Sequence, residues 1–172
     1  HHSVGLRTDC TVAAAGGQHE QRGQCNVSDW KDIVAVSAGD YQTVGLKADG
    51  TVVLVGSSLH GLHDVSDWKD IVAISSGDSY TVGLRMDGSV VVTGGDALDR
   101  SYIPAWENII AVSTAHDHAV CLKEDGTVVA AGGNTFGECD ISDWKDITAI
   151  STAVTHTVGL KEDGTVVATG SN

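Results

Sequence analysis

The sequence predicts an all-β protein built from the blades of a β-propeller, with about 38 residues to each blade. Two recurring motifs support this prediction. A Ser-Asp-Trp-Lys-Asp corner occurs three times, with a fourth, decayed copy. A Val-Gly-Leu unit occurs five times, with one change at Cys121. Repeats of this length are typical of propellers and solenoids. The corners place four tryptophans 38 residues apart, at Trp30, Trp68, Trp106 and Trp144.

Each repeat divides into four short extended segments, which we name a to d and illustrate in the third repeat. Segment a covers residues 71–75, segment b residues 80–85 and segment c residues 89–93. A loop over residues 94–100 leads to segment d, near residues 102–103. Short runs with alternating apolar side chains and no helical spacing predict β-strands throughout.

The connection between segments b and c decides between two repeat architectures. It carries an Asp-Gly turn, as at Asp87-Gly88, which predicts a tight antiparallel hairpin. Four strands in about 40 residues is the usual size of a propeller blade. A parallel β-helix is the alternative, but its strands do not reverse direction. The recurring hairpin therefore favours blades.

Segment a is predicted to lie innermost, because small side chains fit where strands crowd around an axis. The tryptophans are predicted to lie between neighbouring blades, where each removes on the order of 150–250 Å² from water. The small residues of segment a recur in two phases: Ala35, Ala73, Ala111 and Ala149 in one, and Ser37, Ser75, Ser113 and Ser151 in the other.

The repeat resembles the bacterial branch of the RCC1 (regulator of chromosome condensation) type. Residues 156–170 read His-Thr-Val-Gly-Leu-Lys-Glu-Asp-Gly-Thr-Val-Val-Ala-Thr-Gly, and residues 137–147 read Gly-Glu-Cys-Asp-Ile-Ser-Asp-Trp-Lys-Asp-Ile. The resemblance covers essentially the whole chain and implies a ring of four-stranded blades, commonly seven. Known members exchange nucleotides on a small GTPase, inhibit β-lactamases or bind other partners. Exchange-factor or inhibitor activity here rests on the resemblance alone, because function does not follow from fold.

The segment order is bcd, abcd, abcd, abcd, abc, so four to five blades are present in a single domain. Its repeat units are 1–30 (partial), 31–68, 69–106, 107–144 and 145–172 (partial). Four inner segments are too few for the usual seven-bladed ring. We therefore expect a fragment of a larger propeller, or an arc whose incomplete terminal blades associate with another copy. A strict monomer with a compact closed ring of four blades would contradict this expectation.

The two faces of the predicted blades differ in how much they vary. The b–c hairpins and d–a corners are nearly uniform, whereas the a–b and c–d loops differ in every repeat. Variable loops on a constant scaffold are typical of a binding surface, and aromatic and arginine side chains dominate interface hot spots. Unselected drift of the loops is the alternative. The candidate partner-binding residues are Arg22, Tyr41, Leu59, His60, Tyr80, Arg100, His116 and Phe136.

Charge narrows the class of partner. The net charge is −13, from 23 acidic and 10 basic residues. Nucleic-acid binding needs a basic stripe, and none is visible. No apolar run approaches the roughly 20 residues of a membrane helix. We therefore expect a protein partner, with no nucleic acid and no membrane insertion. A structural array in an extracellular or oligomeric assembly and a glycan-binding propeller are alternatives, and a secreted or cell-surface location is preferred to a cytoplasmic one.

The chain is predicted to have no catalytic residues, no cofactor and no metal. His116-Asp117-His118 with Cys121 invites a metal interpretation, but on an extended strand Cys121 faces away from the two histidines. His118 also shares its repeat position with His2 and His156, which indicates a structural role. No two cysteines have CxxC spacing, so we predict free, buried thiols.

Overall fold

The computed structural model describes residues 2–16, 22–57, 64–95 and 105–171. Fourteen β-strands and no α-helix lie in these residues, so none of the described segments is a helix able to span a membrane. The strands are β1 (His2–Leu6), β2 (Val12–Gly16), β3 (Ile33–Ala38), β4 (Gln42–Lys47), β5 (Val52–Gly56), β6 (Ile71–Ser76), β7 (Tyr80–Arg85), β8 (Val90–Gly94), β9 (Ile109–Thr114), β10 (His118–Lys123), β11 (Val128–Gly132), β12 (Ile147–Ala153), β13 (His156–Lys161) and β14 (Val166–Gly170).

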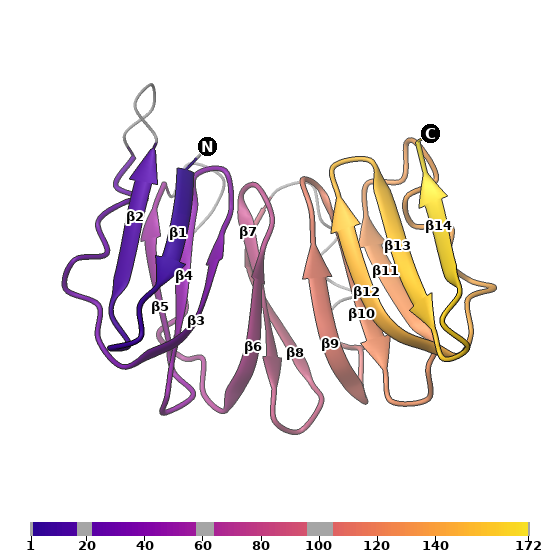
Figure 1. Ribbon diagram of the computed structural model, residues 1–172, viewed down its shortest axis with the longest axis horizontal. Helices are drawn as coiled ribbons and strands as arrows, with labels where there is room; N and C mark the ends of the chain where they lie inside the picture. The colour runs from indigo at the N-terminus through magenta and orange to yellow at the C-terminus, as the bar shows by residue number, and fades with distance from the viewer. Residues whose placement is uncertain (1, 17–21, 58–63, 96–104, 172) are drawn as a thin grey trace.

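The strands form five antiparallel sheets that stand side by side along an arc (Figure 1). The first sheet pairs β1 with β2, and the others are β3-β4-β5, β6-β7-β8, β9-β10-β11 and β12-β13-β14. Segments a, b and c are the three strands of each complete sheet. The a strands of consecutive sheets contact one another on the hollow side of the arc, as predicted for the innermost segment. Their small polar residues link them, since Ser75 hydrogen-bonds Thr114 and Ser113 hydrogen-bonds Thr152.

Segment d differs from the prediction, because it forms no strand in the residues that the structure describes. Before the last corner, the N–H of Asp140 donates to the carbonyl of Gly137, and the N–H of Ile141 donates to that of Cys139. These local turn bonds occupy the amides that a fourth strand needs for pairing. The same pattern holds at Asn26 and Val27. Each described blade therefore has at most three strands, while residues 102–103 lie outside the described part.

The b–c hairpins share one turn. In the second sheet, Asp49 accepts hydrogen bonds from the N–H of Thr51 at 3.0 Å and from its hydroxyl at 2.6 Å. Gly50 has φ 78°, the left-handed conformation that a three-residue hairpin loop requires. Cys10 takes the place of this glycine in the first hairpin and keeps φ at 63°. The same carboxylate cap recurs at Asp9, Asp87, Asp125 and Asp163.

The d–a corners join one blade to the next through the backbone. Asp70 has φ 57°, which Asp and Asn tolerate better than most residues. The following N–H, of Ile71, donates to the carbonyl of Gly50 in the preceding hairpin. The decayed corner keeps this geometry because Asn108 stands there with φ 58°. The corner aspartates are therefore turn residues, as predicted.

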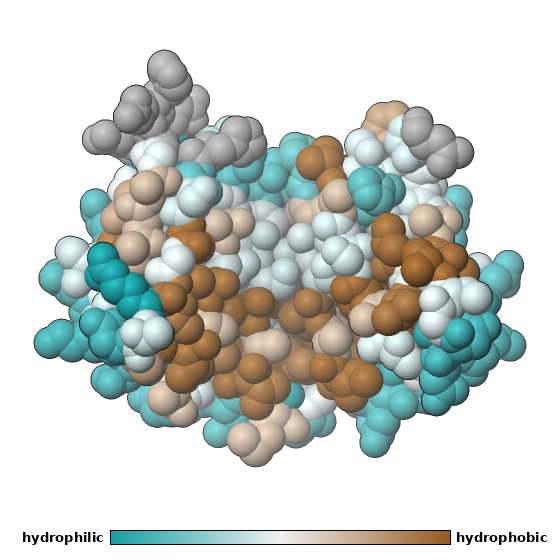
Figure 2. Space-filling view, viewed as in Figure 1, coloured by the Kyte–Doolittle hydropathy of each residue, from teal (hydrophilic) through white to brown (hydrophobic). Residues whose placement is uncertain are grey.

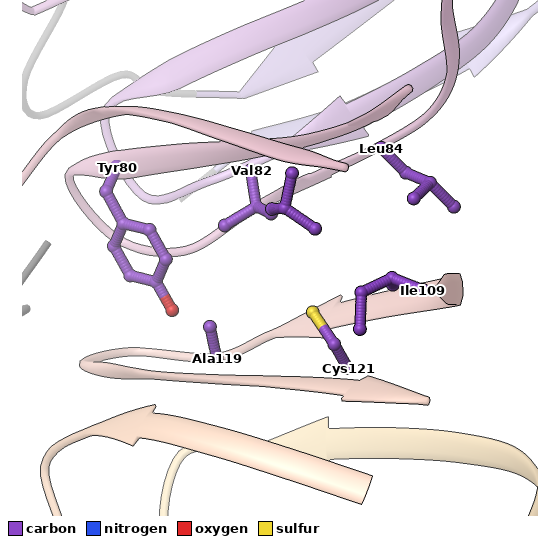
Figure 3. Close-up of a cluster of buried hydrophobic side chains, with 7 residues drawn as sticks. Tyr80, Val82, Leu84, Ile109, Ala119 and Cys121 are labelled. Atoms are coloured by element: carbon purple, nitrogen blue, oxygen red, sulfur yellow. The ribbon is translucent and has the colours of Figure 1, made fainter. Parts of the chain in front are cut away.

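The tryptophans lie between neighbouring blades, as predicted. The Trp68 ring covers Gly83 so closely that a Cβ built there would lie 2.6 Å from it. Trp30 over Gly45 and Trp144 over Gly159 repeat this contact. At the remaining junction, Cys121 replaces the glycine, and Trp106 is only partly buried. Figure 3 shows this junction, where Cys121 and Ile109 face Val82 and Leu84 of the preceding blade.

The hollow side of the arc is apolar over part of its height. Figure 2 views this side and shows apolar side chains gathered over the lower part of the inner wall, with paler residues above. The second residue of an inner strand lies at a β-bulge and stays about half exposed, at 48% for Val34 and Val72 and 56% for Ile110.

Candidate functional site on the loop face

The a–b turns and the described parts of the c–d connections lie on one edge of the arc, opposite the hairpins (Figure 1). The N–H of Ser57 donates to the carbonyl of Tyr41, and the N–H of Gly133 donates to that of Asp117. Bonds of this kind tie the end of the c strand to the a–b turn of the same blade in the second, fourth and fifth sheets. We call this surface the loop face, made of residues 22–24, 39–41, 57, 77–79, 95, 115–117, 133–138 and 154–155. The opposite edge, with the hairpins and corners, is the hairpin face.

Arg22 and Tyr41 form the first feature of the loop face. The guanidinium carbon of Arg22 lies 4.9 Å from the centroid of the Tyr41 ring, in cation–π geometry. Arg22 also donates to the hydroxyl of Ser57 at 3.4 Å. Both side chains are partly exposed. Arg22 and Tyr41 are about 20 positions apart in the sequence but lie together in the fold. This is expected if both belong to one binding surface.

His116 and Asp78 form the second feature and bridge the turns of neighbouring blades. His116 Nε2 lies 2.8 Å from Asp78 Oδ2, and the side chains are 55% and 24% exposed, respectively. Burial raises the pKa of Asp78 above its usual value, and the charge of Asp40 adds to this shift, whereas His116 opposes it. Acidic side chains therefore lie close enough to interact across successive turns.

Phe136 is the third feature and is 55% exposed. Its loop is held by polar contacts. The N–H of Phe136 donates to the Glu138 carboxylate at 2.7 Å, and the Asn134 side chain bonds both Asp140 and the N–H of Cys139. A large apolar side chain is thereby presented to solvent on an ordered loop, which suits a contact anchor.

The expectation that Tyr80 belongs to this surface is wrong. Tyr80 is 1% exposed, and its hydroxyl donates to the carbonyl of His118 at 2.5 Å and contacts that of Ala115 at 3.2 Å. Its ring lies against Gly77, where a Cβ would approach it to 2.1 Å. Burial raises its pKa. Tyr80 occupies the same position in its repeat as His118. The repeat position that indicated a structural role for His118 therefore also indicated one for Tyr80.

The remaining candidates divide into two groups. Arg22, Tyr41, His116 and Phe136 lie on the loop face with exposed surface. Leu59, His60 and Arg100 lie outside the described residues. Sequence reasoning did not select Asp78 or Glu138, and it considered Asp117 only within His116-Asp117-His118, where it did not prefer a metal role. Asp78 meets His116 because neighbouring blades pack together, whereas Glu138 meets Asp117 and His118 within one repeat.

His118 lies just beneath the loop face and is fully buried. Its Nε2 is 3.2 Å from the hydroxyl of Thr157 in the next blade. Burial lowers the pKa of His118, while Asp117 and Glu138 oppose this shift. The backbone N–H groups of its own loop lower the pKa of Glu138. Asp117, His118 and Glu138 have ligand atoms within 4.8 Å of one another, so among the described residues they form a group able to hold a cation.

The cysteines carry no comparable site. All four are free, as predicted, although Cys10 is exposed and only Cys121 is fully buried. Cys121 faces the preceding blade, away from His118, in agreement with the strand argument. Burial raises its pKa to about 12, so it stays a thiol near neutral pH.

No protein-family model matches the chain, and no curated protein matches its sequence. Solved structures match over 98% of its length. One is the ectodomain of the Arabidopsis thaliana receptor kinase ACR4, with 20% identity, a TM-score of 0.79 and 65% of that chain covered. Another is Prp20p, the yeast RCC1, from Saccharomyces cerevisiae, with 14% identity, a TM-score of 0.76 and 56% covered. The fold is that of an RCC1-like β-propeller. Human WBSCR16 matches similarly, with 16% identity, a TM-score of 0.76 and 59% covered.

The chain spans about half to two thirds of the solved propellers that it resembles. Its arc accordingly has two blade faces with no neighbouring blade. Leu160 of the last blade is 41% exposed, whereas Leu84 and Leu122 at the same repeat position are 3% and 1% exposed. Val166 is 63% exposed, where Val90 is 2%. At the other end, a Cβ on Gly5 would meet nothing within 4 Å.

Proposed function

We propose that this RCC1-like propeller is a non-catalytic protein-binding module whose loop face contacts a basic surface on its partner. The main observation in support of this proposal is the difference between the loop face and the hairpin face. The loop face diversifies between repeats and presents Phe136 and the Arg22–Tyr41 pair, while the hairpin face repeats one hydrogen-bonded turn. Side chains held on such a scaffold lose little conformational freedom on binding.

Charge supports a basic partner. Asp40, Asp78 and Asp117 lie in successive a–b turns, and their charges act on one another through Asp78. The whole chain carries a net charge of −13. Complementary charge speeds association and suppresses wrong partners more than it adds affinity. We therefore expect binding to weaken as the salt concentration rises.

The structural neighbours agree with this class of function without naming the partner. Yeast RCC1 was solved bound to Kap60, and Prp20p was characterised for binding to Gsp1p and histones. These are protein partners of those proteins. At 14% identity the likeness is one of fold, so the partner of this chain has to be found directly. The secreted or cell-surface location of this chain stays a prediction. One of the matched structures, that of ACR4, is the ectodomain of a receptor kinase.

Matched variants on the two faces test the proposal. Quantitative pull-down from the native source is compared for the unchanged chain, Phe136→Ala, Tyr41→Ala and Met86→Ala. Met86 is 76% exposed beside a b–c hairpin and serves as the control. A partner retained by Met86→Ala and lost by both loop-face variants supports the proposal. Equal recovery with all four proteins contradicts it, provided that thermal unfolding shows each variant folded.

A second function, blade-to-blade assembly, is favoured by the end faces. The exposed Leu160 and Val166 occupy positions that are buried in the second, third and fourth sheets, where another blade follows, although Leu6 of the first sheet is also 40% exposed. We propose that another blade covers this surface, supplied by further repeats of a longer protein or, for the chain as given, by a second copy in solution. Light scattering is expected to give a mass above that of the monomer, and Leu160→Asp is expected to lower it. A strict monomer at all concentrations would contradict assembly while leaving the loop-face proposal intact.

A further inference from the structure

The junction between the fourth and fifth sheets contains a group of metal-binding side chains from two segments of the chain. Asp117 belongs to an a–b turn, His118 begins β10, and Glu138 belongs to the c–d connection. Their ligand atoms all lie within 4.8 Å of one another. His118 is 0% and Glu138 2% exposed, while the Asp117 side chain is 32% exposed and leads to the loop face.

The hydrogen bonds of Thr157 fix which nitrogen of His118 carries its proton. The Thr157 hydroxyl donates its single proton to the carbonyl of Glu138 at 2.8 Å. Its contact with His118 Nε2, at 3.2 Å, therefore has the imidazole N–H as the donor. In the neutral ring, Nδ1 then bears a lone pair. This buried atom has no hydrogen-bond partner.

The Nδ1 lone pair and the neighbouring carboxylates are all acceptors. Asp117 Oδ1 lies 3.8 Å from Nδ1, and Glu138 completes the group. A buried polar atom without a partner is costly, which is why such atoms are rare. A cation satisfies all three groups at once. We propose that His118 Nδ1, Asp117 and Glu138 bind a divalent transition-metal ion of the Zn²⁺ type.

The surroundings are those of a prepared metal site. A metal-binding histidine typically donates its other ring N–H to an oxygen that fixes the ring, which Thr157 does for His118. Glu138 is held by the N–H of Phe136 at 2.7 Å. Imidazole with carboxylates is a common zinc ligand set, leaving a coordination position for water. The partly exposed Asp117 provides the route of entry.

The first junction offers an internal comparison. His2 has the repeat position of His118, pairs with Thr43 through Nε2, and also has Nδ1 without a partner. However, Gln24 stands where Glu138 stands, and it accepts the N–H of Arg22 in the same manner. The neutral amide removes one anionic ligand. The site is therefore assigned to the junction that carries the acids.

Zinc titration of the chelator-treated chain tests this site. Calorimetry is expected to give one tight equivalent per chain, and zinc is expected to raise the unfolding temperature. Asp117→Asn and Glu138→Gln are each expected to weaken affinity about tenfold or more. Asp40→Asn, on the same face, is the control and should bind as the unchanged chain does.

Nitrogen-15 NMR of the His118 ring supplies the readout that a structural role would not move. Zinc is expected to shift Nδ1 while Nε2 keeps its proton. Zinc binding that survives both acid substitutions, or a His118 Nδ1 resonance that zinc does not shift, would overturn the site. These outcomes concern zinc alone, so they are independent of the partner-binding proposal.

Discussion

On the hairpin face, each described blade uses the same aspartate cap and a left-handed residue at the same position, which is glycine in four hairpins and Cys10 in the first. On the loop face, no two blades present the same side chains. The reason lies in the hydrogen bonds. Each corner donates its backbone to the preceding hairpin, as Ile71 does to Gly50, so a change there disturbs two blades at once. The loop face is tied by fewer such constraints between blades. Recurrence along this chain therefore marks architecture, and divergence marks the surface available for recognition.

The tryptophan contacts at the blade junctions differ from one junction to the next. Trp68 lies over Gly83 and is 6% exposed. At the next junction, Cys121 has replaced the glycine and Trp106 is less buried. Burial of the indole does not follow the glycine alone, because Trp144 lies over Gly159 and is also only partly buried.

Among the substitutions that compare the blade junctions, truncation of a tryptophan should change the free energy of unfolding most. We expect Trp68→Ala to lower the free energy of unfolding by about 3–5 kcal/mol, because it opens a cavity between two blades. Trp106→Ala should cost less, since that ring is only partly buried. Urea denaturation measures both. Equal losses would show that the two junctions are equivalent after all.

Glycine substitution tests the same contact from the opposite strand. Gly83→Val places a side chain against the Trp68 ring, where a Cβ alone would lie 2.6 Å away. Overpacking of this kind costs about 1–3 kcal/mol, sometimes more. Gly5→Val is the matched control, because nothing lies within 4 Å of a Cβ there. A comparable loss at Gly5 would mean that strand propensity, and not the tryptophan, sets the requirement.

Tyrosine hydroxyl removal separates buried from surface positions near the loop face. Tyr80→Phe loses the hydrogen bond to the His118 carbonyl and should cost about 0.5–1.5 kcal/mol. Tyr41→Phe should change stability little and keep the stacked Arg22. Thermal unfolding distinguishes the two. If Tyr80→Phe is neutral, its hydroxyl contributes nothing net to the junction.

The smallest expected effect concerns the hairpin carboxylates. Hydrogen bonds from Ser89, its side chain first and its backbone second, lower the pKa of Asp87. Because the folded-state pKa is below the unfolded value of about 3.9, this cap stabilises the fold above that pH and is lost as pH falls through the folded pKa. NMR titration should find the Asp87 midpoint below about 3.9 and higher in Ser89→Ala. An unchanged midpoint would remove the hydroxyl as the cause.

Local chemistry accounts for what was predictable. The Asp-Gly hairpins, the aspartate corners and the alternating strands each depend on residues within a few positions of one another, so sequence patterns report them directly. Segment d was overestimated because an apolar residue such as Ile141 suits either a strand or a buried turn. Its local backbone bonds decide for the turn.

The sequence by itself determined the repeat, the order of its strands, the place of its tryptophans and which face varies, because these follow from short-range patterns copied along the chain. Only the tertiary structure decided that Tyr80 is core and that Asp117, His118 and Glu138 meet. Tyr80 is buried by residues of the next repeat, Ala115 and His118, so the pattern within its own repeat does not report its burial. Glu138 belongs to the same repeat as Asp117 and His118 but follows them by about 20 positions, so only the folded chain brings the three together.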